Sequence, residues 1–493
     1  MSADPSVYVI VGAVAYLLIL ILVGFYTSRN IRSSADFIVA GRTLPLWLCT
    51  ATVFATWFGS GTLVGAAGAA YTRGISGVLS NPIGSAVCLL LAGMFYVRVL
   101  RRMRLLTVPD LFRTRFGMPA EVLSAVCIIP AYVGWVGSIF VAFGFVLQTI
   151  AGVDTTTAIL IGAAVTLVYT FAGGMWAVSL TDFFQALVIA TGLLVLYPLV
   201  LGEVGGLSGL LTRAPAGHFT ILPGSTLKEW LWFVQAVMVI GVGNIASQDL
   251  MQRAFGARTE SVAQWSMYLA AVVYMTIAML PVLFGIAGKV LLPDIADPEL
   301  VLPSLGMAYL HPFAMALFTG AMFSALMSSA DGGLLAPASI FSENILRVAR
   351  PDLTDRQLLW ATRGAIVVVG MAGLMTALFF QNVYELMVKS FSILFVGLII
   401  PMTAAIYWQR CNGPAAVASL VTGMVGWLTF EWLGTTYPPD LMAAAIGLVT
   451  LVVVTLTTSN RVAPLPLADI DGQQIAYRDR LGTLAFPRLG GSE

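Results

Sequence analysis

Residues 55–62 read ATWFGSGT and interrupt the apolar run over residues 45–69. A second apolar run, over residues 228–251, is interrupted by GVGN at residues 241–244. Each glycine weakens a helix by about 1 kcal/mol relative to alanine, so both runs should break near their middle. Backbone carbonyls freed at membrane depth are tolerated only where they line a cavity or bind something. These two stretches therefore decide how the rest of the chain is interpreted.

The composition places both breaks in a membrane. Of the 493 residues, 59% are hydrophobic and only 10% are charged. A soluble domain averages about 25% charged residues, so this chain needs lipid as its solvent. The net charge of +1 implies no general attraction to nucleic acid, and we expect no such partner.

Runs of about 20 mostly apolar residues predict transmembrane helices. Thirteen such runs occur, and the first is too long for the apolar core of a signal peptide, which predicts a retained helix. We expect an all-α integral membrane domain over residues 1–458 and a short polar tail over residues 459–493. The predicted helices span residues 7–27, 45–69, 75–98, 119–149, 156–173, 182–202, 228–251, 264–288, 311–345, 362–381, 384–408, 414–433 and 440–458.

The basic residues favour one orientation of these helices. With the N-terminus outside, 20 of the 25 Lys and Arg residues fall in inner loops or the tail. Four fall outside, and Lys389 lies within a helix. Because cytoplasmic loops carry an excess of Lys and Arg, we expect a multi-pass protein of the cell membrane (plasma or inner) with a cytoplasmic C-terminus.

The two breaks lie five predicted helices apart. This spacing predicts two repeats, over approximately residues 45–202 and 228–433, each of which opens with a broken helix. Because each five-helix unit holds an odd number of spans, the two units have opposite orientation. This pattern is typical of inverted-repeat secondary transporters, whose binding sites lie at the broken helices. Glycines that merely permit close helix packing are the alternative for either break alone, but the matching positions favour a transporter.

Residues 325–331 read ALMSSAD within the predicted helix over residues 311–345. Ala325, Ser328 and Ser329 share one helix face. Two hydroxyls together with carbonyls freed at the first break would surround an alkali cation without adding a full charge. The serines could instead bond back to their own helix, which is common in membranes.

Two carboxylates fall within predicted spans. Asp182 begins the helix over residues 182–202, and Asp331 lies deep in the helix over residues 311–345. An intramembrane carboxylate is costly and is by default a functional candidate, so either could escort a cation or bind a proton. For Asp182 the alternative is a structural role as a helix N-terminal carboxylate at the membrane interface.

Two tryptophans are candidates for contact with a solute. Trp57 lies inside the first break, and Trp135 lies among small residues in GWVGS at residues 134–138. Aromatic faces bind cations and flat apolar groups, although packing is an equal alternative for Trp135. No Lys or Arg is predicted nearby, which favours a small zwitterionic or cationic solute. The predicted solute-binding residues are Trp57, Gly59, Ser85, Trp135, Asn244 and Ser247.

Little in the sequence suggests a metal centre or an active site. The four cysteines lie far apart with no CxxC pair, and both histidines fall in predicted loops. No nucleophile–base pair or cluster of metal ligands occurs at membrane depth. We therefore expect a protein that is not an enzyme and that carries no cofactor.

Four stretches resemble the sodium:solute symporter family, which includes sodium–glucose, sodium–proline and choline carriers. They are residues 41–42 with 55–61, FAGGMWAVSLTDFFQ at 171–185, Gln252-Arg253, and residues 325–331. The likeness runs from about Val7 to Leu456. It implies a LeuT-type fold of two inverted five-helix repeats plus flanking helices, with sodium as the coupling ion and a small solute as cargo.

The resemblance also implies particular sodium ligands. They are the carbonyls of Ala55, Phe58 and Ala325 and the hydroxyls of Ser328 and Ser329. Asp182 matches the aspartate that family members place near the inner sodium exit, and that some use in a second sodium site.

Within the family the nearest likeness is to the choline-carrier branch. That branch has a second cage tryptophan where this chain has Ser247, and a tyrosine where this chain has Ser85. Only Trp57 and Trp135 of the aromatic cage remain, which argues against choline itself. We expect a sodium-coupled symporter that imports a small zwitterionic or cationic solute. The alternatives are a carrier coupled to protons or working by exchange, and a transporter-like sensor, against which the short tail argues.

Overall fold

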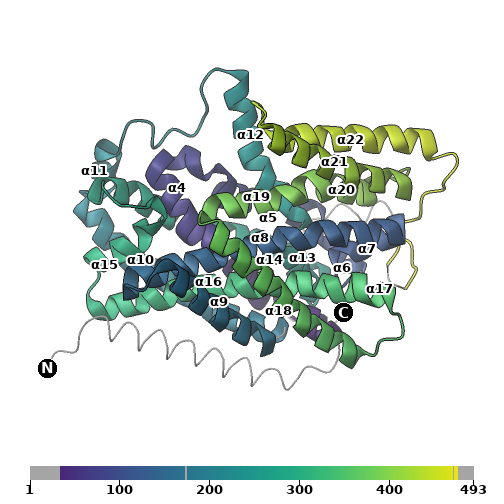
Figure 1. The fold of residues 1–493 in the computed structure, drawn as a ribbon, viewed down its shortest axis with the longest axis horizontal. Helices are drawn as coiled ribbons and strands as arrows, with labels where there is room; N and C mark the ends of the chain where they lie inside the picture. The colour runs from purple at the N-terminus through teal and green to yellow at the C-terminus, as the bar shows by residue number, and fades with distance from the viewer. Residues whose placement is uncertain (1–33, 173–174, 470, 476–493) are drawn as a thin grey trace.

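The computed structural model describes residues 34–172, 175–469 and 471–475. Within these residues the regular structure is helical apart from two isolated β-bridges (Figure 1). In the described part of the chain, ten helices are long and apolar enough to cross a membrane, and Leu46–Trp57 and Thr155–Val168 form shorter apolar helices. The predicted helix over residues 7–27 lies outside the described residues. The all-helical membrane architecture is thus confirmed, while the count of thirteen spans is not.

The first half of the chain contains the first broken helix and ends with a long helix that carries Asp182. Its elements are α2 (Ser34–Val39), η2 (Ala40–Arg42), α3 (Leu46–Trp57), η3 (Gly61–Gly65), α4 (Ala66–Arg73), η4 (Gly74–Val78), η5 (Leu79–Gly84), α5 (Ser85–Phe95), α6 (Val97–Arg102), α7 (Val108–Phe116), α8 (Met118–Ala151), α9 (Thr155–Ala172) and α10 (Met175–Glu203).

The second half opens with a short helix and the second broken helix. Its elements are α11 (Gly206–Arg213), α12 (Leu227–Gly241), η6 (Gly243–Ala246), α13 (Gln248–Gly256), α14 (Glu260–Leu291), η7 (Pro298–Leu300), α15 (Val301–Tyr309), α16 (Pro312–Ile340), η8 (Phe341–Leu346), α17 (Arg347–Ala349), α18 (Asp355–Phe379), α19 (Val383–Ile393), η9 (Leu394–Leu398), α20 (Ile399–Tyr407), α21 (Gly413–Leu433) and α22 (Pro439–Thr458).

The first break lies where the sequence predicts it. α3 ends at Trp57, and Phe58 leaves the helical conformation with φ −83° and ψ 62°. Helical structure resumes at Gly61. Only glycine fits at residue 59, because a Cβ on Gly59 would lie 1.9 Å from the hydroxyl oxygen of Ser329. The broken end of α3 is therefore in direct contact with α16.

The second break is longer than the first. α12 ends at Gly241, and the short turn η6 follows before Ser247 adopts an extended conformation with φ −74° and ψ 139°. The next helix, α13, then begins at Gln248. A Cβ on Gly243 would lie 2.5 Å from the Cβ of Phe395, so this break packs closely on η9.

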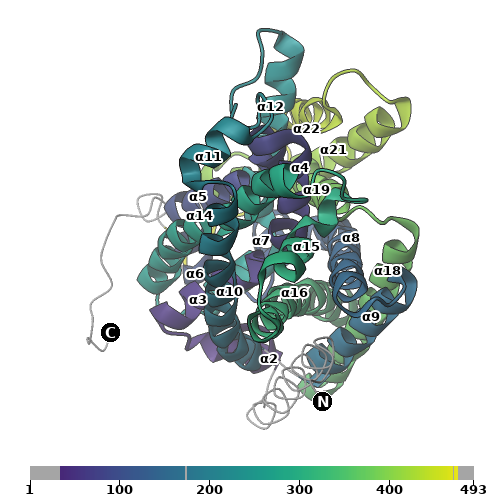
Figure 2. The same cartoon turned by 90° about the vertical axis from the view of Figure 1, so that its left-hand side faces the viewer.

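The broken helix α3 contacts three long helices of the bundle. It packs against α10, α14 and α16, and α10 in turn packs against α16 (Figure 2). Helices α21 and α22 pack on each other at one edge of the molecule, next to α12 (Figures 1 and 2). This arrangement brings residues from both predicted repeats to the break of α3.

Short helices in the connections were not predicted. Helices α6, α7, α11 and α15 have between 6 and 9 residues each. A search for about 20 apolar residues passes over such segments because they are too short to span a membrane. The described start of the tail packs near α7, where the Arg115 guanidinium donates to the carbonyl oxygen of Leu465.

Candidate cation and solute sites

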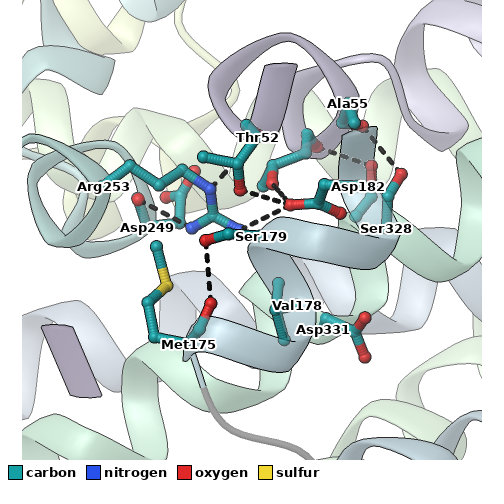
Figure 3. A network of polar contacts seen from close by, with 12 residues as sticks. Thr52, Ala55, Met175, Val178, Ser179, Asp182, Asp249, Arg253, Ser328 and Asp331 are labelled. Carbon is teal, nitrogen blue, oxygen red and sulfur yellow. Dashed lines mark hydrogen bonds and ion pairs between the residues drawn. The ribbon is translucent and has the colours of Figure 1, made fainter. Parts of the chain in front are cut away.

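Three of the predicted sodium ligands come together at the break of α3. The hydroxyl of Ser328 on α16 donates to the carbonyl oxygen of Ala55 at 2.7 Å and to that of Ala325 at 3.0 Å. All three residues are fully buried. Figure 3 shows Ser328 beside the end of α3 that carries Ala55. The geometry gathers one hydroxyl and two carbonyl oxygens from two helices at one point.

The other two predicted ligands lie nearby but pair differently. The hydroxyl of Ser329 donates to the carbonyl oxygen of Thr56 at 2.6 Å rather than to that of Phe58. Because α3 ends at Trp57, the carbonyls of its last turn lack helical N–H partners. Hydroxyls of serines on α16 replace those N–H partners. The carbonyl oxygen of Thr56, which was not among the predicted ligands, is therefore a further candidate.

Asp182 lies in the interior of the bundle. It is fully buried within α10, which begins at Met175, so it does not lie at an interfacial helix end. Its carboxylate accepts hydrogen bonds from the hydroxyls of Thr52 and Thr56 on α3, the second at 3.4 Å. Nη2 of Arg253 lies 3.9 Å from the same carboxylate oxygen. Asp182 is therefore next to Thr56, whose carbonyl is one of the candidate cation ligands.

Asp331 is also fully buried but belongs to a separate contact. Its carboxylate accepts a hydrogen bond of 2.7 Å from the hydroxyl of Thr170 on α9. Figure 3 shows it apart from Asp182 and from the Ser328–Ala55 contact. The two carboxylates that the sequence singled out thus have different surroundings.

A small cavity of about 20 Å³ lies beside the break of α3. Ser247 is not among the residues that line it; this serine is buried at the start of α13. Ligand pockets usually have about 300–1,000 Å³, so this cavity must widen before it can hold a small solute. Its lining includes five of the six predicted solute residues, namely Trp57, Gly59, Ser85, Trp135 and Asn244.

The cavity also contains a carboxylate that the sequence reasoning missed. Asp249, in the first turn of α13, is 1% exposed and lines the cavity. Its carboxylate accepts a hydrogen bond of 2.9 Å from the indole N–H of Trp57 and one of 2.5 Å from the hydroxyl of Tyr132. Asp249 lies within the predicted span over residues 228–251, so the rule that selected Asp182 would also have selected it.

Aromatic residues contact this carboxylate and line the cavity beside it. The ring centroids of Trp135 and Phe391 are 5.4 Å apart, and those of Tyr132 and Trp135 are 5.8 Å apart. Trp57 completes the group through its bond to Asp249. Aromatic faces around a carboxylate form an environment that attracts organic cations.

The polar end of the cavity is tied to the break. Asn81 accepts hydrogen bonds from the hydroxyls of Tyr274 at 2.7 Å and Ser85 at 2.9 Å. The hydroxyl of Tyr274 also lies 3.2 Å from the carbonyl oxygen of Trp57, to which it donates. The hydroxyl of Ser85 is therefore already engaged by Asn81, which positions the wall of the cavity.

An open vestibule of about 740 Å³ lies next to this cavity. Helix α19 borders both spaces, because Tyr384 and Val388 line the vestibule while Met387 and Phe391 line the cavity. Two basic side chains, Arg73 and Lys389, line the vestibule. Its carboxylates are more numerous: Asp297, Glu299, Glu385, Glu431 and Asp440.

Comparison with known proteins identifies the family. A model of the sodium:solute symporter family matches residues 37–423, which is most of the chain. The chain belongs to the sodium:solute symporter family. It is therefore a sodium-coupled symporter of a small solute and a multi-pass membrane protein, as the sequence predicts.

Curated relatives of this symporter are transporters. High-affinity choline transporter 1 of Drosophila melanogaster is 28% identical over 84% of this chain and 69% of its own length. High affinity choline transporter 1 of Homo sapiens is 27% identical over 84% of this chain and 75% of its own length. The sodium/glucose cotransporter of Vibrio parahaemolyticus is 25% identical over 90% of this chain and 88% of its own length. The predicted likeness to choline carriers is confirmed.

Solved structures confirm the predicted LeuT-type fold. A substrate-bound, outward-open Na⁺-coupled sialic acid symporter superposes with a TM-score of 0.80 at 21% identity, over 94% of this chain and 99% of that one. MhsT in complex with L-phenylalanine superposes with a TM-score of 0.53 at 13% identity, over 84% of this chain and 98% of that one. At these identities the likeness concerns the fold alone.

Proposed function

We propose that this symporter imports a small organic cation, held by the carboxylate of Asp249 between Trp57 and Trp135. Sodium binds in the same cycle at the break of α3. The observation that carries the proposal is the buried carboxylate of Asp249 inside an aromatic cavity.

The charge of the cavity supports a cation over other solutes. Asp249 is 1% exposed, and the lining of the cavity contains no Lys or Arg. A buried carboxylate is costly unless a positive group compensates it. A cationic amine supplies that charge and gains cation–π attraction from Trp57 and Trp135. A sugar supplies no charge, and a dicarboxylate would be repelled.

The relatives support an amine without deciding which one. Choline transporters are named among them, and choline is a quaternary amine. Ser85 lines the cavity here, whereas Ser247 lies outside its lining. The wall therefore differs from the aromatic cage that the choline-carrier branch implies. The proposal names a class, a small quaternary or protonated amine, rather than choline.

For sodium we propose the carbonyls of Ala55, Phe58 and Ala325 and the hydroxyls of Ser328 and Ser329, with Thr56 added. The contacts of Ser328 and Ser329 with the end of α3 support this set. Trp57 lies next to Thr56 in the chain and bonds to Asp249. One short segment would thus contact both cargoes, which is a physical basis for coupled transport.

The proposed orientation follows from the positive-inside rule, with the N-terminus outside and the C-terminus cytoplasmic. The vestibule residues Arg73, Asn382 and Gly434 lie in segments that this topology places outside. The vestibule would then open to the exterior and lead towards the cavity, as import requires. We also propose that the protein has no enzymatic activity.

Uptake into proteoliposomes tests the proposal directly. We expect an imposed sodium gradient to drive uptake of a labelled cationic amine. Choline and related amines should compete for uptake, while sugars and dicarboxylates should not. Inhibition by a sugar or a dicarboxylate without inhibition by any amine would contradict the cationic assignment. Equal uptake with and without the sodium gradient would contradict sodium coupling.

Two cavity variants locate the solute. Asp249→Asn keeps the shape of the side chain but removes its charge, so affinity for the cation should fall by about 2 kcal/mol or more. Trp57→Leu should weaken binding by about 1–2 kcal/mol, and Trp57→Phe, which keeps an aromatic face, by less. Solute affinity at saturating sodium is the measurement. Unaltered affinity in both Asp249→Asn and Trp57→Leu would place the solute elsewhere.

A further inference from the structure

Three buried charged side chains connect the proposed solute site with the proposed sodium site. Asp249 and Arg253, both on α13, are each 1% exposed, and Asp182 on α10 is fully buried. Two carboxylates and one guanidinium leave one negative charge uncompensated when no cation is bound. Burying such a charge is costly, so the state of this cluster should depend on which cations are present.

Arg253 is held mainly by backbone oxygens. Its Nη1 donates to the carbonyl oxygen of Asp249 at 2.9 Å, and its Nε donates to that of Thr52 at 3.3 Å. A Cβ on Gly332 of α16 would lie 3.2 Å from Nη2, so glycine leaves space beside this atom. Two edges of the guanidinium are thus anchored, and the third faces Asp182.

The pair between Arg253 and Asp182 is open. Nη2 lies 3.9 Å from Oδ2 of Asp182, which is too long for a hydrogen bond. Nη2 of Arg253 and Oδ1 of Asp182 are both buried without a hydrogen-bond partner. Figure 3 shows the guanidinium and the carboxylate facing each other beside Thr52. The two groups attract each other, and the pair retains room to tighten.

Asp182 also adjoins the proposed sodium ligands. Its carboxylate accepts a hydrogen bond of 3.4 Å from the hydroxyl of Thr56, and the carbonyl of Thr56 accepts one from Ser329. A sodium ion at that site and the guanidinium of Arg253 would therefore stabilise the same carboxylate from two sides. Two cations around one anion also repel each other, and in a buried site this repulsion is weakly screened.

We propose that Arg253 competes with the coupling sodium ion for the charge of Asp182. Arg253 compensates the carboxylate while the sodium site is empty, and it weakens sodium binding so that the ion can leave. Arg253 is a positioning residue in this scheme, since it contacts neither sodium nor solute. The inference rests on the proposed sodium site at the break of α3.

The scheme makes an unusual prediction for Arg253→Gln. Without the guanidinium, sodium becomes the nearest group able to neutralise Asp182. The half-saturating sodium concentration should fall, on the order of tenfold, as for a typical coupling between two sites. Maximal uptake should slow, because sodium leaves more slowly. Arg253→Lys keeps the charge and should stay close to wild type in both quantities.

The experiment uses the purified full chain, with two readouts. Sodium-dependent uptake into proteoliposomes gives the half-saturating sodium concentration and the maximal rate. Thermal unfolding with and without sodium gives a readout independent of transport, and sodium should raise the Tm of Arg253→Gln more than that of wild type. An unchanged or increased half-saturating sodium concentration in Arg253→Gln would overturn the proposal.

A second pair of variants keeps the test decisive if Arg253→Gln does not fold. Asp182→Asn leaves the guanidinium uncompensated, so sodium should bind more weakly. In the double variant Asp182→Asn with Arg253→Gln this repulsion is gone, and sodium affinity should partly recover. Removing both charges leaves no uncompensated buried charge behind, unlike removal of one partner, so the double variant should fold. Equal sodium affinity in Asp182→Asn and the double variant would refute the competition.

Ser328→Ala separates this inference from the proposed site on which it rests. Suppose that Ser328→Ala weakens sodium binding, while Asp182→Asn and the double variant have equal sodium affinity. The proposed sodium site is then supported, and the competition is wrong. If Ser328→Ala leaves sodium dependence unchanged, the proposed sodium site itself is wrong.

Discussion

At the scale of single residues, the proposed sodium site depends on hydroxyls that reach across a helix interface. Ser328 and Ser329 donate to carbonyls of α3 that have lost their helical partners. Ser339, on the same helix and equally buried, instead donates to the carbonyl oxygen of Leu335 in its own helix at 2.7 Å. The difference lies in the neighbouring element rather than in the type of residue.

We expect Ser328→Ala to raise the half-saturating sodium concentration. Removing one oxygen ligand from a desolvated cation should cost about 1–3 kcal/mol, comparable to an unmade buried hydrogen bond. Ser329→Ala should act in the same direction. Sodium titration of solute uptake is the measurement, with Ser339→Ala as the matched control. Wild-type sodium dependence in both Ser328→Ala and Ser329→Ala would locate the cation elsewhere.

At the scale of elements, the proposed sodium site depends on the break of α3 and on its close packing against α16. Gly59 has no space for a side chain, since a Cβ would lie 1.9 Å from the hydroxyl oxygen of Ser329. The second break instead places Asp249 in the first turn of α13, where it lines the cavity. Each break therefore contributes a different group to the centre of the molecule.

Gly59→Ala tests the close contact between α3 and α16. The added methyl group should push Ser329 away from Thr56 and weaken sodium and solute binding together, with a loss of about 1–3 kcal/mol from overpacking. Gly364→Ala is the matched control, because a Cβ there meets no atom within 4 Å. Sodium and solute titrations of uptake provide the comparison. If Gly59→Ala and Gly364→Ala bind sodium and solute equally well, the contact between α3 and α16 can adjust to the added methyl group.

Glu299 ties the start of α19 to the η7 turn, outside the membrane spans. Its carboxylate accepts hydrogen bonds from the backbone N–H groups of Val383 and Tyr384, both at 2.9 Å. Burial raises the pKa of Glu299 from an ordinary 4.5 to about 7, although these two bonds oppose the shift. The folded protein therefore binds this proton more tightly than the unfolded chain does.

This raised pKa predicts a pH dependence of stability. The contribution of the Glu299 proton is fully present below about pH 4.5 and is lost as pH rises through about 7. The free energy of unfolding of the wild type should fall by on the order of 3 kcal/mol over this range. We expect Glu299→Gln not to show this fall. Thermal unfolding across that pH range is the measurement, and Asp294→Asn, which removes an exposed carboxylate from the same connection, is the control. The same fall in wild type and Glu299→Gln would contradict the assignment.

At the scale of the whole molecule, the vestibule and the cavity are neighbouring spaces. Helix α19 borders both, and carboxylates outnumber basic side chains around the vestibule. Clefts lined by one sign of charge raise the local concentration of ions of the opposite sign. The vestibule should therefore favour the arrival of the same class of solute that Asp249 favours in the cavity.

Glu431→Gln tests this attraction. We expect the half-saturating concentration of a cationic solute to rise about twofold at low ionic strength, with the maximal rate unchanged. Added potassium salt at constant sodium should abolish the difference, because salt screens exposed charges. Asp294→Asn removes a carboxylate that does not line the vestibule and should have no effect. A change in Glu431→Gln that persists at high salt would indicate a different cause.

Much of the architecture is determined by the sequence alone. Hydropathy predicts the membrane, and Gly-x-Gly pairs predict both breaks, because these properties belong to single helices. The spacing of Ala325, Ser328 and Ser329 likewise predicts one shared face. The first predicted helix lies outside the described residues, and the orientation from basic residues stays a prediction.

Only the tertiary structure decided which groups meet. The spacing of residues in the sequence does not predict that Ser329 donates to the carbonyl of Thr56 rather than to that of Phe58. It also does not predict that Asp249 lines the cavity while Ser247 does not. The contact between Asp182 and Arg253 is likewise not predicted by sequence spacing. Periodicity along one helix determines which residues share a face, whereas the rotation and depth of neighbouring helices are set by the packing of all of them together.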